Sequence, residues 1–216
     1  MLEEMGAFFD ARVKDYDWHQ LHYIENAGEF YLYTAHLLPW QDRARVLDLG
    51  CGTGLELQEY FLLNPSARVT GIDLAPEMLA VLRQKFRDRI LPLICGSYFD
   101  VPFGENCFDA VVSVESLHHF TAGEKLPLFR KIQSALRDGG YFILTDYYAL
   151  SETEELARRS ELDSIKKAGN TPENVFFHYD TPLTVEHERD ALLQAGFSSV
   201  AILHSWGATC TLRADK

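Results

Sequence analysis

The chain has 216 residues, 47% hydrophobic and 24% charged, which is an ordinary globular composition with enough length for a sizeable core. Its net charge of -12 argues against tight electrostatic binding to nucleic acid or to an anionic membrane. Four widely spaced cysteines without a C-x-x-C pair predict reduced thiols in a cytoplasmic protein. The acidic start does not read as a signal peptide, and no apolar run is long enough to span a bilayer.

The first forty-odd residues contain helical stretches and many aromatic residues but no obvious strand. From there on, short apolar runs alternate with helical patterns, which is typical of β-α-β units and a parallel sheet. Strands are expected over 45–49, 68–72, 90–95, 108–114 and 141–147, with a closing hairpin over 199–204 and 208–213. Helices are expected over 54–63, 76–87, 121–136, 151–167 and 184–195, with a loop over 169–182.

One stretch, VLDLGCGTGLE at residues 46–56, joins the first of these strands to a helix through Gly50, Gly52 and Gly54. A phosphate-binding P-loop is excluded, because no Lys-Ser or Lys-Thr follows the glycines. A dinucleotide loop needs G-x-G-x-x-G, whereas here the third glycine comes one position early and Leu55 stands where glycine is required. The stretch is therefore expected to approach a ligand closely without holding a pyrophosphate.

Two acids indicate what that ligand carries. Asp48, just before the glycines, would repel a pyrophosphate but would suit an ammonium group. Asp73 ends the second strand 19 residues beyond Gly54, where an acid can accept hydrogen bonds from ribose hydroxyls. S-adenosylmethionine supplies an ammonium, a sulfonium and an adenosine, so it fits both acids.

Four motifs in order, VLDLGCGTG, GIDLAPEML, FDAVVSVESLHHF and LRDGGYFILTD, resemble those of the class I S-adenosylmethionine-dependent methyltransferases. The resemblance covers residues 45–146, and the ending LLQAGFSSVAI is also similar to this family. It implies a Rossmann-like, doubly wound α/β fold with a mostly parallel seven-stranded sheet, an antiparallel C-terminal hairpin strand and helices on both faces. It also implies one domain, divided into an N-terminal cap (1–44), a cofactor-binding core (45–147) and C-terminal helices with a closing hairpin (148–216).

By motif position, the resemblance implies that S-adenosylmethionine is the cofactor and S-adenosylhomocysteine the product. The glycine stretch would line the methionine part, Asp73 the ribose, and the residues after it the adenine. Relatives often carry an acid after the third strand, whereas this chain has Ser97 and Tyr98, which would substitute for it. The implied cofactor-binding set is Asp48, Gly50, Cys51, Gly52, Gly54, Asp73, Leu74, Met78, Ser97, Tyr98, Val114, Glu115 and, from the N-terminal segment, Tyr16.

Three side chains after the fourth strand, Glu115, His118 and His119, are candidates for a catalytic base, since a neutral acceptor must lose a proton. The alternative is that one histidine ring packs against the sheet. No metal is expected, because adjacent histidines rarely converge on one ion and no nearby Asp completes a site.

The acceptor pocket is expected from the segments outside the core. The stretch FFDARVKDYDWHQLHY, residues 8–23, is either a lid over the methyl donor or a helix that uses its aromatic residues for packing. A second candidate wall comprises Tyr147, Tyr148, Phe176, Phe177 and His178.

The leading interpretation is methyl transfer to a small-molecule acceptor by in-line displacement in a shielded cleft. The alternatives are a tRNA-modifying methyl or carboxymethyl transferase, a catalytically silent cofactor-binding module and a nicotinamide dehydrogenase. The ending TVEHERDALLQAGF is similar to that of the carboxymethyl transferases. However, Ala191 stands where the carboxylate-binding arginine of those enzymes would align. The acceptor and the oligomeric state, including a homodimer, stay open.

Overall fold

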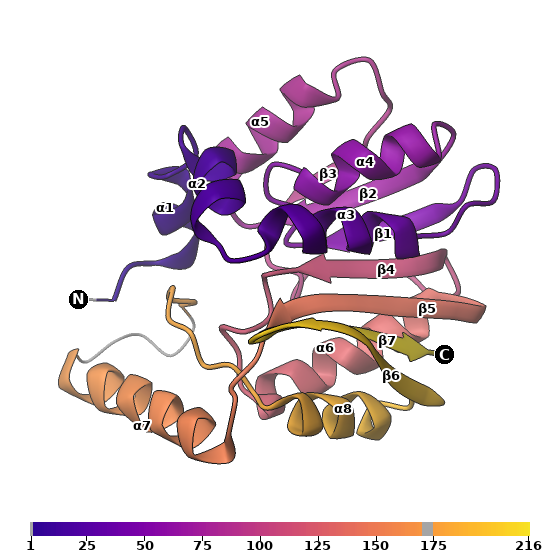
Figure 1. Cartoon of the computed structure of the whole chain (residues 1–216). Helices are drawn as coiled ribbons and strands as arrows, with labels where there is room; N and C mark the ends of the chain where they lie inside the picture. The colour runs from indigo at the N-terminus through magenta and orange to yellow at the C-terminus, as the bar shows by residue number, and fades with distance from the viewer. Residues whose placement is uncertain (1, 170–174) are drawn as a thin grey trace.

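Seven strands form one sheet in the computed structural model, which describes residues 2–169 and 175–216 (Figure 1). The strand order is β3-β2-β1-β4-β5-β7-β6. Neighbours among β1 to β5 pair in parallel, whereas β7 is antiparallel to both β5 and β6, which confirms the predicted fold. The strands are β1 (Arg45–Leu49), β2 (Arg68–Asp73), β3 (Leu93–Cys95), β4 (Phe108–Val114), β5 (Leu136–Tyr147), β6 (Ser199–Trp206) and β7 (Thr209–Asp215).

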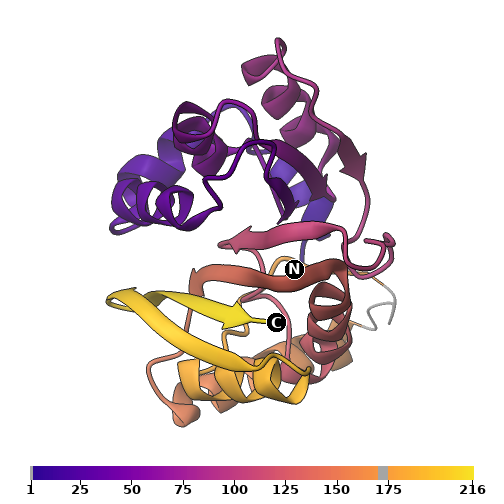
Figure 2. The ribbon, with the colours of Figure 1, turned by 90° about the vertical axis from the view of Figure 1, so that its right-hand side faces the viewer.

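Helices cover both faces of this sheet (Figures 1 and 2). Buried side chains of α3, α4 and α5 pack on one face, and those of α6 and α8 pack on the other. The helices are α1 (Met5–Asp10), α2 (Tyr16–Tyr23), α3 (Ala27–Leu37), α4 (Leu55–Leu63), α5 (Pro76–Lys85), α6 (Ala122–Ala135), α7 (Glu152–Gly169) and α8 (Val185–Gln194). Among them, α7 is 18 residues long and buries one residue, Leu162. No helix of the described residues is long and apolar enough to cross a membrane.

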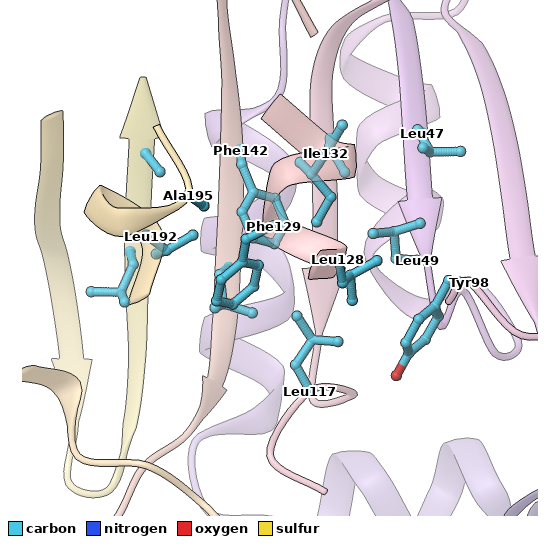
Figure 3. Close-up of a cluster of buried hydrophobic side chains, with 14 of the residues drawn as sticks. Leu47, Leu49, Tyr98, Leu117, Leu128, Phe129, Ile132, Phe142, Leu192 and Ala195 are labelled. Atoms are coloured by element: carbon cyan, nitrogen blue, oxygen red, sulfur yellow. The ribbon is translucent and has the colours of Figure 1, made fainter. Parts of the chain in front are cut away.

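Side chains of the central strands point alternately to the two faces of the sheet, so each strand contributes to the hydrophobic core on both faces. On β1, Val46 packs with α3 and α4, whereas Leu47 and Leu49 pack with the α6 side, because successive strand side chains point to opposite faces. Figure 3 shows the second of these cores, where α6 contributes Phe129 and Ile132. Full burial of each such side chain stabilises the fold by about 1.5–3 kcal/mol.

Helix boundaries follow the predicted caps. Thr121 and Glu124 form the expected capping box before α6, with the Thr121 N–H donating to Glu124 Oε2 at 2.8 Å. Before α7, the Glu154 N–H donates to Ser151 Oγ at 3.2 Å, but the Glu154 carboxylate accepts from Leu150 instead of closing the box.

Two strand boundaries differ from the prediction by three residues or more, and the other strand ends agree within two residues. β3 begins at Leu93 rather than at residue 90, since Ile90 is 97% exposed and Pro92 has no N–H for a ladder. β5 begins at Leu136 rather than at residue 141, and its pairing with β4 shifts register between Phe108 and Ala110. The predicted loop over 169–182 lies partly outside the described residues. Its described part from 175 contains no helix and one isolated bridge, Phe177 to Glu4.

Candidate functional site

The glycine stretch turns sharply between β1 and α4. Gly50, Gly52 and Gly54 have φ of 72°, 46° and 75°, the left-handed region that favours glycine. A Cβ at Gly50 would lie 2.1 Å from Ser116 Oγ, so the loop passes directly against the chain that leaves β4. The Gly50 N–H donates to the Ile72 carbonyl at 2.8 Å, which fixes the loop to the end of β2.

Asp73, the last residue of β2, holds this loop from the other side. Its Oδ2 accepts from the Gly52 N–H and its Oδ1 from the Ala75 N–H, both at 2.8 Å. Burial raises the pKa of Asp73, while these two N–H groups oppose the rise by stabilising the carboxylate. Each oxygen keeps a lone pair for a ligand.

A narrow cavity, called here the loop cavity, opens where the carboxyl ends of β1, β2 and β4 meet. Two of its lining side chains are carboxyls, Asp73 and Glu115, and none is Lys or Arg, so within the described residues its walls favour a cation over a phosphate. It brings together eight of the predicted cofactor residues, namely Tyr16, Gly50, Gly52, Asp73, Leu74, Met78, Tyr98 and Glu115.

Five predicted cofactor residues lie outside this lining, and Asp48 is the one whose placement differs most from its expected role. Asp48 is 1% exposed and lies beside Glu56 of α4, and its Oδ2 has no hydrogen-bond partner among the described residues. Burial raises the pKa of both carboxyls, because neither charge is solvated there. The acids that face the cavity are Asp73 and Glu115, and the contact of Asp48 with a ligand ammonium stays a prediction.

The other four support the walls from behind. Cys51 packs against β2, since a Cβ at Gly71 would lie 2.7 Å from its Sγ, and burial raises the pKa of its thiol. Gly54 faces α5, where Leu82 and Phe86 would crowd a Cβ. Ser97 Oγ accepts from the Phe99 N–H at 3.1 Å. Val114 is buried in the core that the sheet forms with α3 and α4.

A second and larger cavity, of about 740 Å³, adjoins the first and is called here the aromatic cavity. Its walls come from α1, α2, the end of β4, the segment before α8 and the β6–β7 hairpin. Aromatic side chains dominate them, namely Phe8, Phe9, Tyr16, Tyr23, Tyr147 and Trp206, together with the rings of His19 and His178. Phe9, Tyr16, Glu115 and His119 line both cavities, so the two meet at one wall.

Only two of the five residues predicted to form a second wall of the acceptor pocket line the aromatic cavity. Tyr147 and His178 line the aromatic cavity, whereas Tyr148 is 2% exposed in the core. Phe176 stacks on Phe99 at a ring distance of 5.3 Å, away from the cavity, and Phe177 forms the bridge to Glu4.

Glu115 stands at the junction of the two cavities. Its φ of 49° is left-handed, which is uncommon for a residue other than glycine and frequent at functional sites. Burial raises its pKa to about 7, although the neighbouring His118 lowers it. A carboxyl with a pKa near neutrality accepts and releases protons readily at physiological pH.

His118 and His119 differ in charge although they are adjacent. His118 Nδ1 lies 2.6 Å from Asp146 Oδ1, and this carboxylate outweighs burial and raises the pKa of His118 to about 9. Burial and the charge on His118 lower the pKa of His119 to about 4, so its ring is neutral at pH 7. The expectation that no Asp lies near the pair is corrected, since Asp180 Oδ1 lies 3.1 Å from His119 Nδ1 and 3.6 Å from His118 Nε2.

Several functional candidates were not expected from the sequence. Asp146 ends β5 beside β4, so its position at the same carboxyl edge was a usable signal. Ser116 follows Glu115 directly in the chain, whereas Asp180 and Thr209 carry no local signal, because folding alone brings them beside Glu115 and the histidines.

The N-terminal segment forms a roof over both cavities, at the end of the sheet where α1 and α2 lie in Figure 1. The Met5 N–H donates to the Phe176 carbonyl at 2.9 Å, and the Phe8 and His178 rings stack at 3.5 Å. On α2, Asp17 accepts from Thr53 Oγ1 and pairs with Lys85 Nζ, both at 2.5 Å. These contacts tie α2 to the glycine loop and place Tyr16 beside it.

Comparison with known proteins agrees with this geometry. Residues 47–144 match the family model described as a methyltransferase domain. A fatty-acid O-methyltransferase of Mycolicibacterium smegmatis is 33% identical over 102 residues, which are 47% of this chain and 36% of that protein. The chain spans about a third to a half of the length of the first curated relatives that it matches.

Solved structures share the fold. A putative O-methyltransferase of Nostoc punctiforme superposes with a TM-score of 0.71 at 24% identity, over 99% of this chain and 62% of that one. PigF with SAH gives a TM-score of 0.70 at 20% identity, over 99% of this chain and 63% of that one. Residues 47–144, which include the three glycines and the acid that ends β2, match a methyltransferase domain, and the relatives support a class I S-adenosylmethionine-dependent methyltransferase with S-adenosylmethionine as its cofactor.

Proposed function

We propose that the protein transfers the methyl group of S-adenosylmethionine to a small-molecule acceptor by in-line displacement. The observation that carries this proposal is the wall shared by the loop cavity and the aromatic cavity, which contains Tyr16, Glu115 and His119. A donor in the first cavity and an acceptor in the second would meet there. Positioning is the main requirement of this reaction, because the sulfonium already activates the methyl group.

The donor would lie along the glycine loop. Asp73 has free lone pairs for the ribose hydroxyls, and Leu74 and Met78 offer apolar contact for the adenine. The absence of Lys and Arg from the described lining suits a sulfonium and disfavours a phosphorylated nucleotide. In the same arrangement the roof would exclude water from the transferred methyl group.

Proton removal from a neutral acceptor would fall to Glu115 or His119. Both line the shared wall, and both have a basic form available at pH 7. Without a bound cation, the Asp146 carboxylate holds His118 as an imidazolium, so His118 is not a candidate base.

The test follows a labelled methyl group from S-adenosylmethionine into an extract divided into small molecules and tRNA. We expect label in the small-molecule fraction and a turnover lowered about 100-fold by Glu115→Gln, the usual size of a lost base. S-adenosylhomocysteine affinity should change less than threefold, and exposed Glu105→Gln is the matched control. Label in tRNA, or in neither fraction, would contradict the proposal.

A further inference from the structure

A second feature of the aromatic cavity, independent of the cofactor, is the convergence of three side chains at its wall. His118, His119 and Asp180 each offer one potential ligand atom, and these atoms all lie within 4.8 Å of one another. The distances from Asp180 Oδ1 are 3.1 Å to His119 Nδ1 and 3.6 Å to His118 Nε2. Ligands about 2.0–2.2 Å from one ion are separated by about 2.8–3.6 Å at cis or tetrahedral angles, so these two spacings match a coordination shell.

The side chain of Asp180 is 44% exposed, but its Oδ1 is turned inward toward the two histidine rings. Its Oδ1 has no exposed surface and accepts no aligned hydrogen bond from the described residues. The nearby His119 Nδ1 also faces the Tyr179 carbonyl, at 3.3 Å, and one ring proton serves only one of two acceptors. If the proton of the His119 ring is on Nε2 instead, both His119 Nδ1 and Asp180 Oδ1 have a free lone pair, and a cation between them could bind to both.

His118 is oriented in the manner of a metal ligand. Its Nδ1 is bonded to Asp146, whose two oxygens also accept the N–H groups of Leu117 at 2.8 Å and Tyr147 at 2.9 Å. A carboxylate anchored in this way fixes the ring and directs Nε2 toward Asp180. Ligating histidines usually donate their second N–H to such a carboxylate.

We propose that His118, His119 and Asp180 bind a first-row divalent cation such as Zn²⁺ at the wall of the aromatic cavity. Two imidazoles and one carboxylate suit Zn²⁺, Co²⁺, Mn²⁺ or Fe²⁺ better than Mg²⁺ or Ca²⁺, which prefer oxygen ligands. Three protein ligands leave coordination positions open, and all three residues line the cavity. Binding would release the Nε2 proton of His118 and would occupy His119 Nδ1, so Glu115 would be the base that remains. An acceptor oxygen would complete the shell; that last step rests on the proposed methyl transfer, whereas ion binding does not.

The test is calorimetric titration of tag-free, chelator-treated and dialysed protein with ZnCl₂, and separately with CoCl₂ and MgCl₂. We expect one Zn²⁺ per chain, visible ligand-field absorption from bound Co²⁺, and Mg²⁺ affinity at least about tenfold weaker. Asp180→Asn should weaken Zn²⁺ binding more than about 100-fold and Asp146→Asn about 10–100-fold. Exposed Asp190→Asn on α8 is the matched control and should bind as the wild type does.

Three results would overturn the metal site: no Zn²⁺ binding by the wild type, equal binding by Asp180→Asn, or equal affinity for Mg²⁺ and Zn²⁺. Circular dichroism checks that each variant is folded. S-adenosylhomocysteine titration of the same samples keeps the two proposals separate, since a protein that binds this nucleoside but no Zn²⁺ contradicts only the metal site.

Discussion

The loop cavity and the aromatic cavity are built in different ways. The first includes two short stretches, the glycine loop and the turn after β2, which backbone N–H groups hold in place. The second is assembled from side chains of segments as distant as α1 and the β6–β7 hairpin. A backbone site tolerates few changes, whereas a side-chain site allows its ligand to be altered while the fold is kept.

The largest expected effect is on the backbone site. Gly50→Ala places a Cβ 2.1 Å from Ser116 Oγ and 2.6 Å from Ser116 Cβ, at a φ of 72°. We expect S-adenosylhomocysteine affinity to fall about 100-fold or more, since roughly 3 kcal/mol of strain corresponds to that factor. Calorimetry measures it, and Gly28→Ala in α3, where a Cβ has no neighbour within 4 Å, is the control. Affinity unchanged within twofold would contradict the close approach.

A change confined to the aromatic cavity should separate the two sites. Ala208 lines this cavity and not the loop cavity, so Ala208→Phe would fill the space of the acceptor. We expect labelled-methyl turnover to fall about tenfold or more, the loss typical of misplaced reactants. S-adenosylhomocysteine affinity should stay within twofold. Exposed Ala201→Phe on β6 is the control, and a parallel loss of both quantities would show that the cavities are not separable.

The roof links the two sites through Asp17. Asp17→Ala removes the partner of Thr53 Oγ1 and Lys85 Nζ, so the free energy of unfolding should fall by about 1–3 kcal/mol. Hydrogen exchange over residues 15–24 should accelerate, because α2 would lose its attachment to the loop. Asp15→Ala is the matched control, as Asp15 makes no capping hydrogen bond. Equal exchange in the two variants would mean that packing alone holds α2.

The smallest effect expected is a pH dependence of cofactor affinity. Burial raises the pKa of Asp73, so its carboxylate is lost on acidification at a higher pH than for an exposed aspartate. Protonation removes an acceptor for ribose hydroxyls, so affinity should weaken as pH falls through that raised value. In Asp73→Asn the affinity should be weaker and lack this acid limb. Titrations across the folded pH range compare the two proteins, and identical profiles would remove Asp73 from the binding role.

The sequence predicted the two regions unequally, for physical reasons. β1, β4 and the box at Thr121 appeared as expected, since alternation, burial and capping are local signals. Gly50, Gly52 and Asp73 lie together at one loop, because the turn needs glycine and the Asp73 carboxylate accepts its N–H, while their contact with the cofactor stays a prediction. Asp48 is buried beside Glu56 and does not line the loop cavity, which its position in β1 alone does not reveal. Asp180 was missed, since its distance from the histidines depends on the path of the chain between α7 and α8.

One consequence follows from the backbone at Glu115. A glutamate held at a φ of 49° is less stable there than glycine or asparagine would be. Selection for thermal stability alone would therefore replace this glutamate. In random libraries selected for thermal stability, substitutions at position 115 should raise stability and lower turnover.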